Sequence, residues 1–130
     1  MIALTNCNRI LVVTSRDFKA LDILCGHTLP ILALDVSDFT ADIISYSWGN
    51  LLLHRLENSE NSYQDFTIRT SAPKWSLCWR IDMLMSIKCL WFSTIGDFFL
   101  ATGKNLVNIW KRDNVDSFNS EILLTGKDNL

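Results

Sequence analysis

The chain has 130 residues, of which 48% are apolar, and this size and composition predict one folded domain with a buried core. The formal net charge is −2, and no basic run is longer than Lys111-Arg112. These values exclude a general nucleic-acid-binding surface, because such a surface needs clustered Lys and Arg to neutralise phosphates.

Short apolar runs follow one another along the whole chain. Each is flanked by Gly, Pro, Asn, Asp or Ser, which is the pattern of antiparallel strands joined by turns. No segment keeps apolar residues at the i, i+3, i+4, i+7 spacing of a helix between caps. The pattern therefore predicts an all-β chain. The expected strands are residues 9–14, 18–24, 31–36, 42–47, 50–56, 75–81, 87–92, 98–103, 105–111 and 121–125.

One segment interrupts this series of strands. Residues 57–73 are polar and rich in Ser and Asn, so we expect a long exposed loop between two strands. Its central sequence, DFTIRT, leaves a short additional strand open as an alternative. A rigid sheet commonly presents function on its loops, which makes this insertion a candidate for contacts with a specific partner.

Residues 83–101 are rich in large apolar side chains and raise the question of a membrane span. Lys88 and Asp97 interrupt the segment, and Gly96-Asp97 is a turn signal. A spanning helix needs about 20 mainly apolar residues. Two buried strands joined by a turn therefore explain the segment better than a membrane helix.

Three of the expected strands begin with asparagine. NRILVV starts at Asn8, NLLLHR at Asn50 and NLVNIW at Asn105, at intervals of 42 and 55 residues. The longer interval contains the insertion, so a shared period near 40 residues is plausible. The preceding strands also correspond, since PILALDV matches SIKCLWF and DIISYS matches FFLATG. A repeat of about 40 to 45 residues with four strands is typical of a WD-repeat β-propeller.

Individual residues support this interpretation. Gly26-His27 lies between one set of strands and the next, where WD repeats place Gly-His, and Trp110 ends a third strand, where they place the Trp of Trp-Asp. In this alignment Lys111 replaces the Asp, and Arg55 replaces the Trp of the preceding copy. The predicted blades are a half blade over 8–25, a blade over 31–81 with the insertion at 57–73, and a blade over 87–125.

Two and a half blades do not close a ring, because propellers have about four to eight. We therefore expect a partial propeller: a piece of a larger protein, a truncated form, or a chain that assembles with other copies. Exposed edge strands and an uncovered apolar face predict self-association of the isolated chain.

The order of strands and turns also resembles the N-terminal WD repeats of the rabconnectin/DmX-like family. Ser15, Asp17, Phe18, Leu21 and Ile23 resemble one strand of that family, and Lys74, Trp75 and Cys78 resemble its strand after a long loop. The next blade is matched by Cys89, Leu90, Trp91, Ser93, Leu100, Gly103, Leu106 and Trp110. The likeness covers most of this chain, and Arg55 and Lys111 depart from it. It implies a scaffold that helps assemble and regulate the V-type proton ATPase on endosomal, vacuolar or vesicle membranes.

Catalysis and cofactor binding have little support in the sequence. A nucleophilic triad could be formed only from His27, Asp35 and a serine. No serine lies in a Gly-x-Ser-x-Gly turn, which argues against such a triad. Glycines form neither G-x-G-x-x-G nor a P-loop. We expect no enzyme activity, no cofactor and no metal. His27 is expected to be a turn histidine that hydrogen-bonds within the blade, and His54 to face the surface or be partly buried.

Partner contacts are assigned to aromatic residues. Most of the five tryptophans are expected to pack between blades. Trp48, in the turn SWGN, is the tryptophan most suited to be an exposed anchor. Tyr63 and Phe66, inside the insertion, complete the candidate partner-binding residues.

The sequence predicts a cytosolic chain without disulfides. Its N-terminal sequence lacks the basic region, long apolar run and cleavage site of a signal peptide. We expect Cys7, Cys25, Cys78 and Cys89 to be reduced and mostly buried, since none forms a Cys-x-x-Cys pair that would suggest zinc.

The predicted function is a scaffold that binds proteins, held at endosomal, vacuolar or vesicle membranes through its partners. The alternative is a WD-repeat subunit of another complex, in trafficking or RNA processing.

Overall fold

The computed structural model of the chain describes residues 1–57, 73–83, 85–114 and 117–125, with side chains described up to residue 120. Within these residues the chain forms eleven strands and no helix. In chain order the strands are β1 (Ile2–Asn6), β2 (Arg9–Val13), β3 (Ala20–Leu24), β4 (Ile31–Val36), β5 (Ile43–Ser47), β6 (Asn50–Leu56), β7 (Trp75–Asp82), β8 (Cys89–Phe92), β9 (Phe98–Gly103), β10 (Leu106–Asn114) and β11 (Ser117–Thr125).

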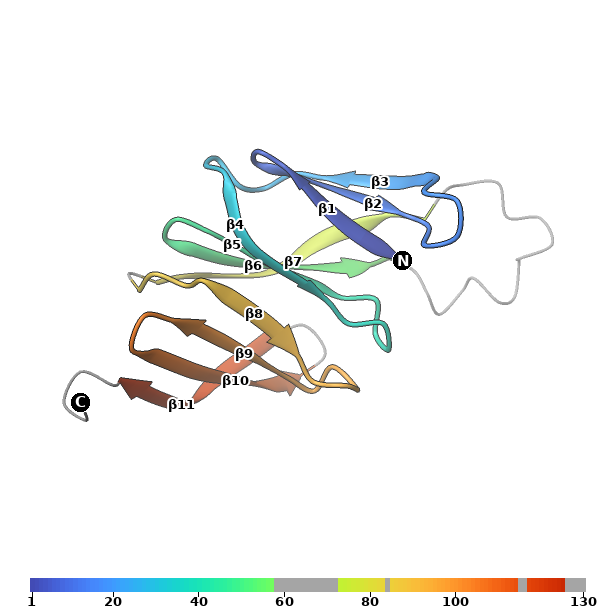
Figure 1. Cartoon of the computed structure of the whole chain (residues 1–130). Helices are drawn as coiled ribbons and strands as arrows, with labels where there is room; N and C mark the ends of the chain where they lie inside the picture. Colours follow the sequence, from blue (N-terminus) through green and yellow to red (C-terminus); the bar gives the residue numbers. More distant parts are fainter. Residues whose placement is uncertain (58–72, 84, 115–116, 126–130) are drawn as a thin grey trace.

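These strands form three antiparallel sheets, which stand beside one another in chain order (Figure 1). The first sheet has the strand order β1-β2-β3, the second β4-β5-β6-β7 and the third β8-β9-β10-β11. None of the three sheets closes on itself. The prediction of an all-β chain with about two and a half antiparallel four-stranded blades that do not close is confirmed.

The sheets approach one another along their first strands. β4 and β8 are neighbours in space, as are β1 and β4. The backbone N–H of Phe92, at the end of β8, donates a hydrogen bond of 2.6 Å to Oδ2 of Asp35 in β4. We call β4 and β8 the innermost strands of their sheets.

The core lies between the sheets in two clusters. One, between the first and second sheets, contains Ile10, Val12 and Ile43. The other, between the second and third sheets, is centred on Phe99, whose ring stacks on Trp110 with centroids 6.0 Å apart. The second sheet is covered on both faces, so every residue of β5 is buried, including the polar residues Ser45 and Ser47.

The strand predictions agree closely with the structure in the middle of the chain. The expected strands 31–36, 50–56 and 98–103 have the predicted bounds, and the apolar segment 83–101 contains β8 and β9 joined by a turn. β1 is an additional strand that the sequence did not predict. The alternative strand DFTIRT lies outside the described residues.

The register corrects the alignment of the repeats. Asn105 is the second residue of a two-residue turn and adopts a positive φ of 55°, whereas Gly49, with φ 92°, holds that position in the second sheet. The alignment is therefore wrong by one residue at Asn50, whereas Asn8 holds the same turn position as Asn105. Asn and Gly are interchangeable at this turn position because both tolerate the left-handed conformation. The residue in the second sheet that corresponds to Trp110 is His54, which pairs with Ile43 as Trp110 pairs with Phe99.

Candidate protein-interaction site

Three loops, one from each sheet, lie at the same end of the molecule. They span residues 14–19 between β2 and β3, 37–42 between β4 and β5, and 93–97 between β8 and β9. Figure 1 shows them on the right, opposite the tight turn that joins β5 to β6. We call the surface formed by these three loops the loop face.

The three loops are built in the same way. Each begins with a hydroxyl residue whose backbone N–H donates a hydrogen bond of 2.9 Å to the carbonyl oxygen five residues later. These pairs are Thr14 with Lys19, Ser37 with Asp42, and Ser93 with Phe98. Near its end, each loop reverses direction at a residue with positive φ: Phe18 (56°), Ala41 (62°) or Gly96 (78°). The repeated hydrogen bonding gives each loop a defined shape.

Each loop exposes one large apolar side chain. Phe18 is 66% exposed, Phe39 73% and Ile95 53%. Single exposed apolar residues are common on protein surfaces, but three on loops at one end of the molecule make this end a candidate interface. Charged residues on the same loops, such as Asp17 and Asp38, are also exposed and supply a polar rim. The hydroxyl of Thr14 lowers the pKa of Asp17, so its carboxylate stays charged at neutral pH.

A buried ion pair joins the second and third sheets beneath the loop face. The carboxylate of Asp42 is completely buried, and Nη2 of Arg112 donates to its Oδ2 over 2.8 Å. The same guanidinium donates to the carbonyl oxygen of Gly96 from Nη2 at 2.6 Å and from Nε at 3.1 Å. Nε of Arg55 lies 3.9 Å from Oδ1 of Asp42. The loops 37–42 and 93–97 are thus held together by one arginine.

Trp75 connects the first and second sheets in a similar way. Its backbone N–H donates to Oδ2 of Asp22 in β3 over 2.8 Å. Its indole Nε1 donates to the carbonyl oxygen of Ala41 over 2.7 Å. The loops 37–42 and 93–97 are thus tied to neighbouring elements, and β3, which follows the loop 14–19, is tied to the second sheet at Asp22. These bonds give the loop face a preorganised frame for its apolar side chains.

The predicted partner-binding residues are not all on this face. Trp48 is 61% exposed, as expected of an anchor, but it lies in the β5–β6 turn at the other end of the sheet. The seven residues of β6 separate it from Glu57, where the insertion starts, by about 20 Å. Tyr63 and Phe66 lie outside the described residues. A binding role for these three residues stays a prediction.

A buried histidine pair lies beside the link between the first and second sheets. Nε2 of His27 is 2.7 Å from Oγ of Ser45, as expected for a turn histidine, and Nε2 of His54 is 3.0 Å from the carbonyl oxygen of Cys25. His54 is only 3% exposed, so the prediction that it faces the surface or is partly buried was wrong. Gly26 has a positive φ of 142°, which favours glycine, and a Cβ there would meet the Leu52 side chain at 2.9 Å and the His54 ring at 3.9 Å.

This pair predicts a loss of stability in mild acid. Burial, with the nearby His54 second, lowers the pKa of His27 to about 4 from its usual 6.5, and burial also lowers the pKa of His54. The unfolded chain therefore binds protons before the folded chain does. We expect full stability above pH 6.5 and a progressive loss, up to about 3 kcal/mol for His27, as the pH falls towards 4. Urea unfolding between pH 7.5 and 4.5, followed by tryptophan fluorescence, measures this loss.

A variant separates this effect from the titration of carboxylates. In His27→Asn the decline of the unfolding free energy between pH 7 and pH 5.5 should be smaller than in the unmodified chain, because only His54 then contributes to it. Equal slopes for the two proteins in this range would show that His27 does not cause the acid sensitivity.

The sequence did contain a signal for the loop face that was not recognised. The segments TSRDFK, SDFTAD and STIGDF each start with a hydroxyl residue, contain an aspartate and precede an apolar strand. Phe18 was expected to begin a strand and Asp42 to begin another, so both were assigned to sheets rather than to loops. The left-handed conformation of Phe18 is not visible in residue type, because phenylalanine rarely adopts it.

The cysteines are free thiols, but they are not mostly buried. Cys7, Cys25 and Cys89 are exposed and Cys78 is intermediate, which corrects the expectation of buried thiols. In the part of the chain that the structure describes, no group of three or more His, Cys, Asp or Glu is placed to hold a metal ion. No helix of the described residues is long and apolar enough to cross a membrane.

Comparison with known proteins gives the fold. No protein-family model matches the sequence, and no curated protein matches it. The β-propeller domain of Myceliophteria thermophila Cps50 (Swd1) is similar in structure, with a TM-score of 0.66 and 12% identity, over 92% of this chain and 37% of that chain. A chain of the Mitotic Checkpoint Complex gives a TM-score of 0.60 and 10% identity, over 90% and 33%. This chain therefore has the fold of part of a β-propeller and spans about a third of the length of these two chains.

Proposed function

We propose that the chain is a non-catalytic WD-repeat scaffold that binds a partner protein through the loop face. The observation that carries the proposal is the set of three exposed apolar side chains, Phe18, Phe39 and Ile95, on loops from three successive sheets. The conformation of Phe18 supports the proposal. A left-handed conformation costs a residue with a Cβ roughly 1 kcal/mol, and the exposed Phe18 ring buries little apolar surface to offset this cost. Folding alone does not account for phenylalanine at this position.

The WD-repeat assignment is supported by residues at the expected places. Gly26-His27 lies in the link between the first and second sheets, and Trp110 lies in the third strand of the third sheet. The Trp110 ring packs between sheets, with Trp79 of β7 at a centroid distance of 5.6 Å. The correspondence of His54 with Trp110 makes the second repeat more divergent than the third.

The finer proposal concerns the partner. The resemblance to the rabconnectin/DmX-like family suggests that the bound proteins are subunits of the V-type proton ATPase and of its assembly complex. The chain would then act in the cytoplasm, at endosomal, vacuolar or vesicle membranes through these partners. The second candidate is a propeller subunit of a different assembly, in line with the origin of one similar structure in the Mitotic Checkpoint Complex.

An affinity capture experiment tests both the binding surface and the identity of the partner. The immobilised chain is incubated with cytosol that contains V-type ATPase subunits, in parallel with a variant that carries Phe18→Ser, Phe39→Ser and Ile95→Ser. We expect ATPase subunits to be enriched on the unmodified chain and to fall to background on the variant. Because all three side chains are more than half exposed, the substitutions should leave the fold intact, which circular dichroism verifies.

Matched controls decide between the outcomes. A Trp48→Ala variant tests the predicted anchor at the other end of the sheet and should retain the partner if the loop face alone binds it. Enrichment no greater than on an unrelated propeller contradicts the ATPase proposal. Equal capture by the triple variant contradicts the loop face as the binding surface, and loss of a different assembly on the triple variant supports the second candidate.

A further inference from the structure

Within the described residues, the first sheet has no counterpart of the strand that is innermost in the other two. A two-residue turn with a positive φ follows β1, at Cys7, just as such turns follow β5 at Gly49 and β9 at Asn105. β1 therefore occupies the second position of its sheet, like β5 and β9. β4 precedes β5 and β8 precedes β9, but no described strand pairs with the remaining edge of β1.

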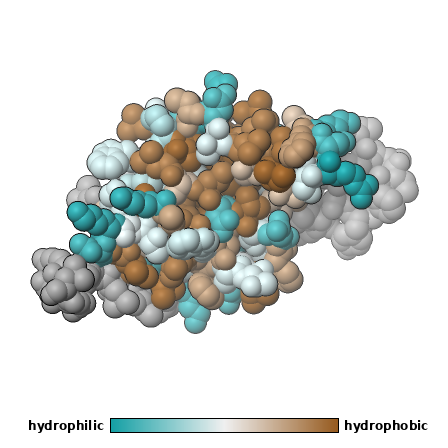
Figure 2. Space-filling view, viewed as in Figure 1, coloured by the Kyte–Doolittle hydropathy of each residue, from teal (hydrophilic) through white to brown (hydrophobic). Residues whose placement is uncertain are grey.

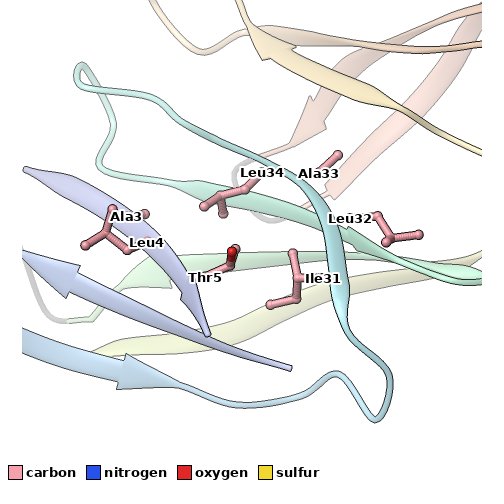
Figure 3. Close-up of a pocket in the computed structure, with 7 residues that line it drawn as sticks. All are labelled: Ala3, Leu4, Thr5, Ile31, Leu32, Ala33 and Leu34. Atoms are coloured by element: carbon pink, nitrogen blue, oxygen red, sulfur yellow. The ribbon is translucent and has the colours of Figure 1, made fainter. Parts of the chain in front are cut away.

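A groove of about 310 Å³ lies beside this edge, between β1 and β4 (Figure 3). Residues 3–5 of β1 and 31–34 of β4 line it, and all seven are uncharged. Leu4 is 46% exposed and Leu32 53%, so apolar surface faces solvent on both sides. Figure 2, in the same view as Figure 1, shows apolar surface across the face where β1, β4 and β8 lie.

Hydrogen bonds fix the two sides of the groove relative to each other. The backbone N–H of Ile31, at the start of β4, donates to the carbonyl oxygen of Cys7 over 2.8 Å. Nδ2 of Asn8 donates to the carbonyl oxygen of His27 over 3.1 Å. The groove is thus already formed in the chain without an occupant, which lowers the ordering cost of filling it.

We propose that the groove binds an extended segment of a partner protein, which pairs antiparallel with β1 as the fourth strand of the first sheet. We infer antiparallel pairing because the strand pairs within the three sheets are antiparallel. The innermost strands β8 and β4 have four and six residues, which sets the length of the segment. An uncharged lining favours apolar side chains, because a charge buried there would find no partner.

The chain itself provides a probe for this site. A fluorescein-labelled peptide with the sequence of residues 30–37, PILALDVS, copies the innermost strand of the next sheet. Titration with the full chain, followed by fluorescence anisotropy, should show saturable binding in a one-to-one complex. Main-chain hydrogen bonds supply much of the affinity in strand addition.

Backbone methylation makes the test specific for strand pairing. Successive N–H groups of a strand point to opposite edges, so only one edge of the peptide can pair with β1. One peptide is N-methylated at the positions of Ile31, Ala33 and Asp35, and another at those of Leu32, Leu34 and Val36. One of the two should lose at least about tenfold in affinity and the other should bind nearly as well as the parent. Equal affinity of all three peptides, or no binding at all, overturns the proposal.

Substitutions in the chain locate the site. Leu4→Asp should weaken binding at least about tenfold, whereas Leu29→Asp, at a residue of the same 46% exposure outside the groove, should not. Phe39→Asp, a change on the loop face, should also leave peptide binding unchanged. The proposal of strand binding at β1 and the proposal of partner binding at the loop face can therefore fail independently. If ultracentrifugation shows a dimer that Leu4→Asp or the peptide dissociates, the occupant is a second copy and the partner segment is excluded.

Discussion

Replacing Arg112 with alanine is expected to lower the free energy of unfolding by about 3 kcal/mol or more. The change removes the 2.8 Å ion pair with Asp42, whose carboxylate is fully buried, and among the described residues leaves Arg55, at 3.9 Å, as its remaining cationic partner. It also removes two hydrogen bonds to the carbonyl oxygen of Gly96 and the contact of the guanidinium with the Phe118 ring, at 4.6 Å. Urea unfolding at low protein concentration and pH 7.5 measures the loss.

Two further variants show whether the ion pair is the cause. Lys111→Ala changes the exposed neighbouring residue and should alter the unfolding free energy by less than about 0.5 kcal/mol. The double variant Asp42→Ala, Arg112→Ala should lose clearly less than the sum of the two single losses, because neither charge is then left buried alone. Strict additivity of the single losses would contradict the proposed coupling.

Replacing Phe99 with alanine is expected to cost about 3 to 5 kcal/mol. Phe99 is 0% exposed and lies at the centre of the cluster between the second and third sheets. Its ring stacks on Trp110 at 6.0 Å and meets the edge of Phe118 at 4.9 Å. The truncation would leave a cavity among rigid aromatic rings, which cannot collapse to fill it. Chemical denaturation followed by tryptophan fluorescence reports the change directly.

The neighbouring residue is a matched control for this substitution. Phe98 is the same residue type in the same strand, but it points to the other side and is 40% exposed. Phe98→Ala should therefore cost much less than Phe99→Ala. Similar losses for the two variants would mean that the third sheet is not packed against the second as described.

The strands were predictable wherever a run of apolar residues lies between clear turn residues. β4, which follows Pro30, and β9, which follows Gly96-Asp97, were expected with their observed bounds. β1 was missed although Ile2–Asn6 is as long as β2, β3 and β5, and three of its five residues are exposed rather than part of the core. The covering of β5 on both faces could not be predicted, since it depends on the neighbouring sheets rather than on the strand.

The candidate site was less predictable than the fold. Trp48 was expected to be exposed and is exposed, because a tryptophan in a two-residue turn has no sheet to pack against. The loop face depends on loops that start at residues 14, 37 and 93 and come to the same end of the molecule only when the sheets stack. The role of Arg112 was equally hidden, since Lys111-Arg112 reads as an ordinary exposed basic pair.

The buried charge of Asp42 has a consequence for synthesis. Asp42 and Arg112 are 70 positions apart, so on the ribosome the carboxylate emerges long before the guanidinium that neutralises it. A nascent chain that ends after β7 can pair all four strands of the second sheet, yet Asp42 would have only Arg55 nearby and would remain hydrated. Such a chain should hold this sheet in a loose form that tightens when β10 arrives. Native packing would then be acquired late, in a single step shared by the two sheets.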